Sequence, residues 1–182
     1  MVKRYKIYPE TTSYYFCTCT VIEWQCIFKS EKYAQIIIES LNYCRKEKGL
    51  YLFGLVIMLN HIHYMVSCRE DCNLSGIIRD FKRYTSTEII KQLENDNERL
   101  LIHIFRKAGK NQRTKIKIWQ DEYHPIAILS DKWFAAKMNY MHNNPVRKGF
   151  VKKPEEWKYS SARNWILGIH DVVSLDLNQL SI

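Results

Sequence analysis

The sequence lacks any long apolar run. A membrane-spanning helix needs about 20 consecutive apolar residues, and none of the 182 residues begins such a run. The opening stretch, MVKRYKIYPETT, has no apolar segment typical of a secretory signal. Internal repeats and Pro/Gly-rich linkers are also missing. We therefore expect a cytoplasmic protein with no contact to a membrane, built mainly around one core.

Cysteine is present, but without the spacing of a metal or redox motif. The chain has six cysteines and no CxxC pair: Cys17, Cys19, Cys26, Cys44, Cys68 and Cys72. Without a secretory signal, such thiols are typical of reduced and mostly buried side chains. Cys68 and Cys72 with a distant partner make only a weak case for zinc.

Acidic residues are too few to balance the basic ones. The 28 Lys and Arg residues against 19 Asp and Glu residues give a net charge of +9 and a pI near 9.2. A chain this basic commonly binds a polyanion, above all nucleic acid. A basic surface with no partner is the alternative. The 12 tyrosines and 5 tryptophans would suit unpaired bases, which stack on aromatic rings.

Apolar periodicity divides the chain into alternating strands and helices. The expected strands cover residues 14–22, 51–58, 61–67 and 126–129, and the expected helices cover 31–48, a segment that begins after Asn73, and 131–144. Because Pro145 cannot continue a helix, the last of these should end before it. The polar stretch 94–117 looks irregular and is expected to be a mobile or partly helical loop.

The order of these elements predicts the fold class. The alternation β-α-β-β-α-β-α is typical of an α+β, ferredoxin-like (RRM-like) sandwich, an antiparallel sheet with helices on one face. On the second helix, the residues expected to be buried are Leu74, Ile77, Ile78, Phe81 and Tyr84. The sequence thus predicts a sheet with one helix-covered face and one open face.

Two histidines interrupt the apolar stretch MLNHIHYMV. His61 and His63 are two residues apart on a predicted strand, so their side chains share one face about 7 Å apart. Two imidazoles at that separation can bind one metal ion, although two surface histidines with no ligand are the simpler interpretation. A metal site would need a third ligand from elsewhere.

The helix that ends at Pro145 supplies candidates for a site. It reads SDKWFAAKMNYMHNNP, and helical spacing puts Tyr140 and Asn144 on one stripe beside the apolar Phe134, Met138 and Met141. If this stripe crosses the open face of the sheet, a phenol and an amide oxygen meet the histidine pair. Taken separately, Tyr140 could be a core-boundary aromatic and Asn144 a helix cap.

These segments resemble a known family. MLNHIHYMV is similar to the His-hydrophobic-His (HUH) motif of single-tyrosine transposases. LSGIIRDFKRYTS, IWQDEYHPIAILS and MNYMHNNPVRKGFVKKPEEWKYSSA resemble REP-associated tyrosine transposases. The resemblance covers most of residues 14–165. It departs at Leu59, where relatives usually have proline before the histidine strand.

The resemblance implies a metal-dependent DNA enzyme. Such relatives cleave and rejoin single-stranded DNA through a 5′-phosphotyrosine intermediate. By this resemblance Tyr140 matches the nucleophile, and His61, His63 and Asn144 match the ligands of a divalent metal, Mg²⁺ or Mn²⁺. It also implies a single-stranded DNA partner carrying hairpin repeats. We assign residues 1–150 to the HUH single-tyrosine transposase domain and 151–182 to a C-terminal extension packed on it.

The basic residues suggest where DNA could bind. Cations on the second helix and in the following polar stretch would neutralise phosphates and make binding sensitive to salt. The candidates are Arg79, Lys82, Arg83, Arg106, Lys107, Lys110, Arg113, Lys115 and Lys117. A solubilising surface is about as good an explanation for each of them.

Three classes of function remain open to the sequence. The first is a strand-transferring enzyme, acting as a monomer or as a homodimer in which Tyr140 serves the partner's histidines. The second is a domesticated protein that binds DNA hairpins with little cleavage. The third is an RNA-binding module of RRM architecture, which ranks last because YLFGLVIML lacks the basic-Gly-aromatic signature.

Overall fold

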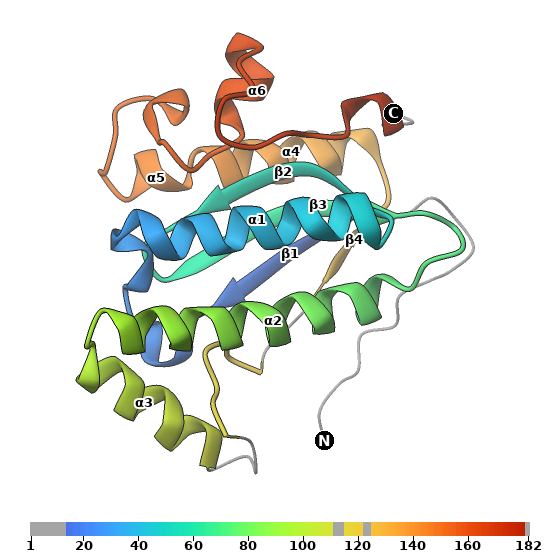
Figure 1. Ribbon diagram of the computed structural model, residues 1–182. Coiled ribbons are helices and arrows are strands. Elements are labelled where there is room, and N and C mark those ends of the chain that lie inside the picture. The colour runs from blue at the N-terminus through green and yellow to red at the C-terminus, as the bar shows by residue number, and fades with distance from the viewer. Residues whose placement is uncertain (1–13, 111–114, 122–124, 181–182) are drawn as a thin grey trace.

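The computed structural model describes residues 14–110, 115–121 and 125–180. A four-stranded antiparallel sheet in the order β2-β3-β1-β4 forms its centre (Figure 1). The strands are β1 (Tyr14–Thr20), β2 (Leu50–Ile57), β3 (His61–Cys68) and β4 (Ile126–Ile128). Because β1 and β2 both run antiparallel to β3, they run in the same direction on either side of it. This is the split βαβ arrangement of a ferredoxin-like fold, which confirms the predicted fold class.

Helices lie around this sheet and extend from it. They are α1 (Glu31–Glu47), α2 (Leu74–Asn95), α3 (Arg99–Lys110), α4 (Asp131–His142), α5 (Asn144–Arg147) and α6 (Ala162–Leu167). Short 3-10 turns occur at Ile22–Trp24, Ile27–Lys29, Pro154–Glu156 and Leu177–Gln179. In the part of the chain that the structure describes, no helix is both long and apolar enough to cross a bilayer.

Alternation along the strands separates two buried faces. On the face covered by α1 and α2, called the α1/α2 face, Cys17 and Tyr64 pack with Phe81. On the opposite face, called the α4 face, Phe16 and Phe53 pack with apolar side chains of α4. The two long helices therefore cover one face, as expected, and α4 lies across the other (Figure 1).

Local contacts and backbone conformation fix where these helices begin and end. The Asn73 side chain accepts a hydrogen bond from the Gly76 amide at the start of α2, and the Ser130 hydroxyl accepts one from the Trp133 amide at the start of α4. These are N-caps, which satisfy amides that the first helical turn leaves unpaired. Gly49 takes a φ of 70° after α1, a conformation that favours glycine.

Two expectations about the second helix and its continuation need correction. Tyr84 is 55% exposed, because α2 buries Phe81 and then Thr85 rather than Tyr84. The described part of the stretch 94–117 is also more regular than a loop, since α2 continues to Asn95 and α3 is a 12-residue helix. An apolar side of α3, including the fully buried Phe105, packs against the core and stabilises this helix in a polar stretch.

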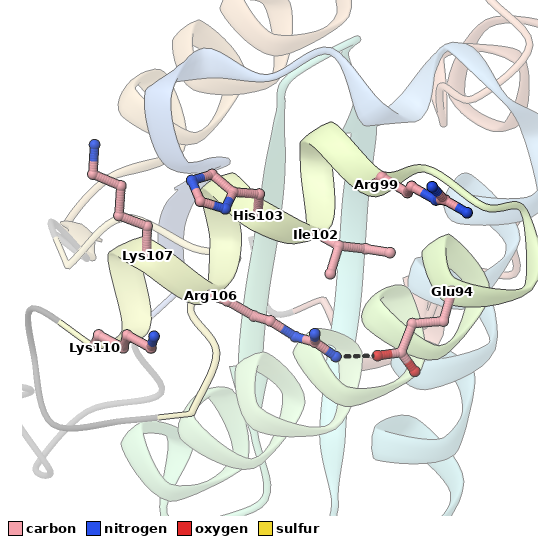
Figure 2. Close-up of a pocket in the computed structure, with 7 residues that line it drawn as sticks. All are labelled: Glu94, Arg99, Ile102, His103, Arg106, Lys107 and Lys110. Atoms are coloured by element: carbon pink, nitrogen blue, oxygen red, sulfur yellow. Dashed lines mark hydrogen bonds and ion pairs between the residues drawn. The ribbon is translucent and has the colours of Figure 1, made fainter.

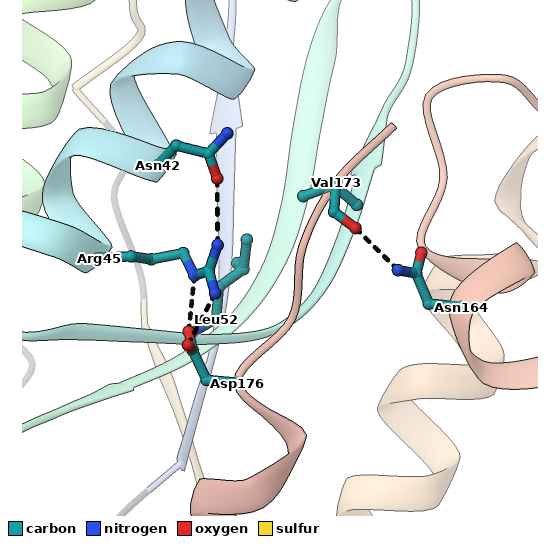
Figure 3. A network of polar contacts seen from close by, with 6 residues as sticks. All are labelled: Asn42, Arg45, Leu52, Asn164, Val173 and Asp176. Carbon is teal, nitrogen blue, oxygen red and sulfur yellow. Dashed lines mark hydrogen bonds and ion pairs between the residues drawn. The ribbon is translucent and has the colours of Figure 1, made fainter. Parts of the chain in front are cut away.

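The C-terminal segment pairs with β2, which is an edge strand of the sheet. The Ile57 amide donates to the Tyr159 carbonyl, and the Ser161 and Asp176 amides donate to carbonyls of β2. Asp176 also accepts a pair of hydrogen bonds from Arg45 of α1, each 2.7 Å long, and one from the Leu52 amide (Figure 3). The segment therefore covers backbone groups that an edge strand would otherwise expose.

Candidate functional site

The two histidines lie side by side on the α4 face of β3. Their ring centroids are 4.8 Å apart, and His63 is 5% exposed while His61 is half-buried. Ile62 and Tyr64 point to the α1/α2 face, as the alternation of a strand predicts. The pair therefore makes one end of the α4 face polar, whereas the rest of that face is apolar.

Hydrogen bonds give both imidazoles the same tautomer. His61 Nδ1 lies 2.7 Å from Asn60 Oδ1, which can only accept, so this nitrogen carries the proton. His63 Nε2 lies 2.8 Å from the Asn144 side-chain amide nitrogen, a donor, so its own proton is on Nδ1, which faces Thr18 Oγ1 at 2.8 Å. In the amide orientations of this structure, both Nε2 atoms are thus unprotonated, and that of His63 accepts a hydrogen bond from Asn144.

Packing of α4 brings Tyr140 and Asn144 to the histidines. Gly54 lets α4 approach β2 closely, because a Cβ there would lie 2.5 Å from the Met141 side chain. Phe134, Met138 and Met141 are buried, as predicted. The helix ends at His142, so Asn144 begins the next short helix, where its side chain is 5% exposed.

The phenol of Tyr140 remains accessible beside this cluster. Its side chain is 41% exposed, and its ring centroid lies 5.8 Å from that of His63 and 6.1 Å from that of Phe16. The structure therefore brings together all four side chains that the sequence singled out for chemistry.

Cations surround the cluster. The Arg147 guanidinium lies 4.2 Å from the centre of the Tyr140 ring and donates a hydrogen bond to the Tyr140 carbonyl at 3.3 Å. The Lys137 ammonium lies 5.7 Å from the same ring. Neither residue, nor Lys148, forms a salt bridge within the described residues. The surroundings of the histidines and Tyr140 therefore favour an anion.

Burial and these cations keep both histidines neutral. Burial, followed by the charge of Lys148, lowers the pKa of His61 to about 4. Burial lowers the pKa of His63 to about 3, with further contributions from His61, Arg147 and Lys137. Neutral imidazole is the form that binds metal ions.

The donor set fits a divalent metal ion. Two neutral imidazoles with unprotonated Nε2 atoms are available, each held by a hydrogen bond at Nδ1 of the kind that orients metal-binding histidines. The described residues contain no cluster of three or more His, Cys, Asp or Glu side chains able to hold a metal. The third donor at hand is the Asn144 amide, whose oxygen a half-turn would bring to the position now held by its nitrogen.

Three neighbours of the site were missed by the sequence interpretation. Thr18 faces His63 because β1 pairs with β3 in the register Thr18↔His63. That register is set by pairing between segments that are distant along the chain, and it cannot be read from the sequence alone. Asn60 directly precedes His61 and lies between two predicted strands, so its position suggested a turn and not a site residue. Arg147 reaches Tyr140 across the break after α4, so helical spacing could not find it.

The predicted DNA-binding residues do not lie in one place. Arg79 and Arg83 are 76% and 80% exposed on α2, close to Asp80. Lys82 donates to the Gln120 carbonyl, Lys117 is paired with Asp121, and Arg106 is paired with Glu94. Lys107, Lys110 and Lys115 are exposed, and Arg113 lies outside the described residues. None of these candidates is among the cations that surround Tyr140.

Comparison with solved structures finds chains that resemble this one. A chain solved as a REP-associated tyrosine transposase bound to a REP hairpin matches with a TM-score of 0.68 at 19% identity, covering 99% of this chain and 96% of that one. A transposase structure from Deinococcus radiodurans matches with a TM-score of 0.48 at 14% identity, covering 78% of this chain and 97% of that one. The first likeness supports the fold described above.

Sequence comparison agrees with this likeness. A Haemophilus influenzae protein assigned as a REP-associated tyrosine transposase is 29% identical over 111 residues, which are 59% of this chain. The match spans 56% of that relative's length. The family model described as "Transposase IS200 like" matches residues 11–108, which include both histidines and more than half of the chain. The chain therefore belongs to the IS200-like transposase family.

Proposed function

We propose that the protein cleaves and rejoins single-stranded DNA, with Tyr140 as the nucleophile and His61, His63 and Asn144 as metal ligands. The observation that carries this proposal is the position of Tyr140: its exposed ring is next to His63, whose Nε2 is 2.8 Å from the Asn144 amide. An accessible phenol beside a metal-compatible donor set is the arrangement that covalent catalysis on a phosphodiester needs.

The covalent step follows from the chemistry of tyrosine. Tyr140 Oη attacks a backbone phosphorus and loses its proton to solvent, which its exposure allows. A phosphorus–oxygen bond forms, and the bond from phosphorus to the 3′ oxygen breaks. The 3′ oxygen leaves and takes up a proton, so the products are a 5′-phosphotyrosine and a free 3′-OH. Because the phosphodiester is exchanged rather than hydrolysed, the step can reverse to join strands.

The cations beside Tyr140 bind and orient the DNA phosphate. Arg147 also fixes the backbone at Tyr140 through its hydrogen bond to the carbonyl. Lys137, whose ammonium lies 5.2 Å from the centre of the Phe16 ring and 5.7 Å from that of Tyr140, adds a second positive charge near the attacked phosphate. Such fixed charges stabilise the extra negative charge that develops during transfer.

A divalent metal held by His61, His63 and Asn144 would supply Lewis-acid chemistry toward the phosphate and the departing oxygen. Two imidazoles favour Mn²⁺ over Mg²⁺ on ligand softness, although either could serve in the cell. Within the chain, Thr18 and Asn60 hold the two rings so that both Nε2 atoms remain unprotonated.

The substrate we propose is a single strand that carries a hairpin. The solved relative is bound to a REP hairpin, and the net charge of +9 is suited to a polyanion. In this proposal the candidate basic residues of α2, α3 and the segment that follows contact phosphates of the hairpin, away from the strand at Tyr140. The protein would act in the cytoplasm, as a monomer or as a homodimer, and the four site residues of one chain lie close together.

A cleavage assay tests the proposal. Single-stranded DNA with the hairpin repeats that flank the gene is incubated with Mn²⁺, with EDTA, and with the Tyr140→Phe variant, and covalent adducts are detected on a denaturing gel. We expect an adduct only when both Mn²⁺ and Tyr140 are present. Retarded but uncut DNA in every lane would instead identify a DNA-binding protein without cleavage activity.

A further inference from the structure

A groove of about 460 Å³ runs along α3, away from the site at Tyr140. Basic side chains dominate its lining: Arg99, His103, Arg106, Lys107 and Lys110, all from α3. Figure 2 shows Arg106 reaching across to Glu94 near the end of α2, while the other four side chains follow α3. The lining contains a single carboxylate, so the groove carries a net positive charge.

The basic residues form one face of α3. Their spacing of three or four residues puts them on neighbouring turns. From Arg99 to Lys110 the helix rises about 17 Å, an axial length over which one strand of a duplex presents about five phosphates. Within the described residues, Arg99, Lys107 and Lys110 form no salt bridge. The helix therefore presents a row of cations at a spacing that suits a phosphate backbone.

The groove and the Tyr140 site lie on opposite sides of the sheet. The α3 helix packs on α2, which covers the α1/α2 face, whereas Tyr140 and the histidines lie on the α4 face (Figure 1). A ligand in the groove is therefore not in contact with the proposed nucleophile. If the groove binds the same DNA molecule as the Tyr140 site, it does so as a second, separate binding site.

The lining also distinguishes between forms of nucleic acid. Single strands bind to platforms of aromatic side chains on which the bases stack. The groove is lined by no Phe, Tyr or Trp among the described residues. The Tyr140 site has the opposite character, with Phe16 and Tyr140 beside the histidines. Contacts in the groove would thus be made to phosphates only, which suits a base-paired stem whose bases are already stacked.

We infer that the α3 groove binds the phosphate backbone of the double-stranded stem of the DNA substrate, while the strand to be cut lies at Tyr140 on the other face. This inference rests on the proposed function for the identity of the ligand as DNA. Arg99, Lys107 and Lys110 contact the phosphates directly. Glu94 competes for Arg106, since the carboxylate holds its guanidinium at 2.6 Å.

Binding of a blunt duplex stem tests the inference. The dissociation constant is measured by fluorescence anisotropy over a range of salt for wild type and Lys107→Gln/Lys110→Gln. We expect the double variant to bind about 10-fold more weakly at low salt, with the slope of log K against log salt reduced by about 2. The control is Lys46→Gln, an exposed lysine of α1, which should change binding less than twofold.

At Glu94 we expect the opposite effect, which is a gain in affinity for the stem. Replacing Glu94 by Gln frees Arg106 and should tighten stem binding by about 3-fold, a modest change because surface ion pairs are weak. Glu47→Gln, an exposed residue of α1, makes the same change in net charge and should have a smaller effect. Equal effects at Glu94 and Glu47 would show that only net charge matters and would overturn the inference.

Failure of this inference can be separated from failure of the proposed function. The double variant should still form the Tyr140 adduct on a single strand without a stem, and Tyr140→Phe should still bind the stem. Unchanged stem binding by the double variant would overturn the inference and leave the Tyr140 chemistry intact. An equal loss of affinity for a stemless single strand would also overturn it, because the groove would then track single strands.

Discussion

The two faces of the sheet are closed by different means. On the α1/α2 face, two long helices cover a continuous apolar surface that runs through Tyr64, Phe81 and Trp119. On the α4 face, one shorter helix and the C-terminal segment cover a smaller apolar cluster, and His63 and Asn144 are buried at its end. Hydrogen bonds satisfy these polar groups at a local cost in apolar packing.

This difference shows which face of the sheet can accommodate a reactive site. The α1/α2 face buries the larger apolar cluster, and burial of apolar surface stabilises the fold. The α4 face can therefore hold neutral histidines and an exposed phenol without losing the fold. Four predictions would break or sharpen this contrast.

Removal of residues 151–182 should have the largest effect. The truncation deprives β2 of its hydrogen bonds with Tyr159, Ser161 and Asp176. It also uncovers the apolar cluster on which Trp157 and Trp165 pack. We expect loss of cooperative unfolding, measured by circular dichroism on heating. If the truncated chain instead folds normally, residues 1–150 form a stable domain without the extension.

A milder control for the truncation is Asp176→Asn. This change keeps the side-chain volume but weakens the paired hydrogen bonds to Arg45, in which both partners are largely buried. We expect a loss of about 1–3 kcal/mol in the free energy of unfolding, with cooperativity retained.

Substitutions on the two faces should separate stability from metal binding. Phe81→Ala removes a fully buried ring and should lower the free energy of unfolding by about 3–5 kcal/mol, with Mn²⁺ affinity unchanged. His63→Ala should cost about 1–2 kcal/mol and abolish Mn²⁺ binding. Urea denaturation and isothermal titration measure the two quantities. If His63→Ala destabilises as much as Phe81→Ala, the polar end is needed for folding and the contrast is wrong.

The buried histidines should make the metal-free protein sensitive to acid. Burial lowers the pKa of His142, which is hydrogen-bonded to Ser161, to about 4, and the pKa values of His61 and His63 are also lowered. The unfolded chain binds these protons below about pH 6.5. Stability is therefore complete above that pH and falls as the pH drops toward 4, by about 2 kcal/mol for each group at about pH 5.

Urea denaturation at about pH 7 and about pH 5 measures this effect, in a range where most free carboxylates remain ionised. His142→Gln keeps a polar partner for Ser161 but cannot titrate, so it should lose less stability between the two values than wild type. An identical loss in both proteins would mean that His142 does not contribute to the acid sensitivity.

The smallest effect on stability is expected from Thr18→Val. Without the hydroxyl, His63 Nδ1 loses its partner at 2.8 Å and the ring is less firmly held. Such partners are worth about 10–100-fold in metal affinity, which Mn²⁺ titration can measure. Thr20→Val is the matched control, since Thr20 pairs with His61 in the strand register while Asn60 holds that imidazole. Equal losses in both variants would point to a general change in β1.

Much of the site was readable from the sequence because its signals are local. The alternation of β3 puts His61 and His63 on one face, and helical spacing puts Tyr140 beside the buried stripe of Phe134 and Met138. Caps at Asn73 and Ser130 begin their helices where expected. The roles of these residues in catalysis remain predictions.

The sequence could not reveal features that depend on distant contacts. Tyr84 follows the spacing of the buried face of α2, but the neighbouring elements cover Thr85, whose hydroxyl accepts a hydrogen bond from Trp119. The helix α3 lies in a stretch whose charge suggested a loop, because its apolar side is stabilised only by the core that it meets. Burial of one side of a helix is a property of the folded chain.

The sequence by itself determined the alternation of strands and helices, the shared face of the two histidines, the excess of positive charge and the family resemblance. Each of these depends on residue identity or on the fixed periods of strand and helix. The tertiary structure decided that α4 crosses the histidine face, that Thr18 and Arg147 join the site, and that the α3 groove lies on the other side of the sheet. These outcomes come from strand register and packing between distant segments, which local periodicity does not encode.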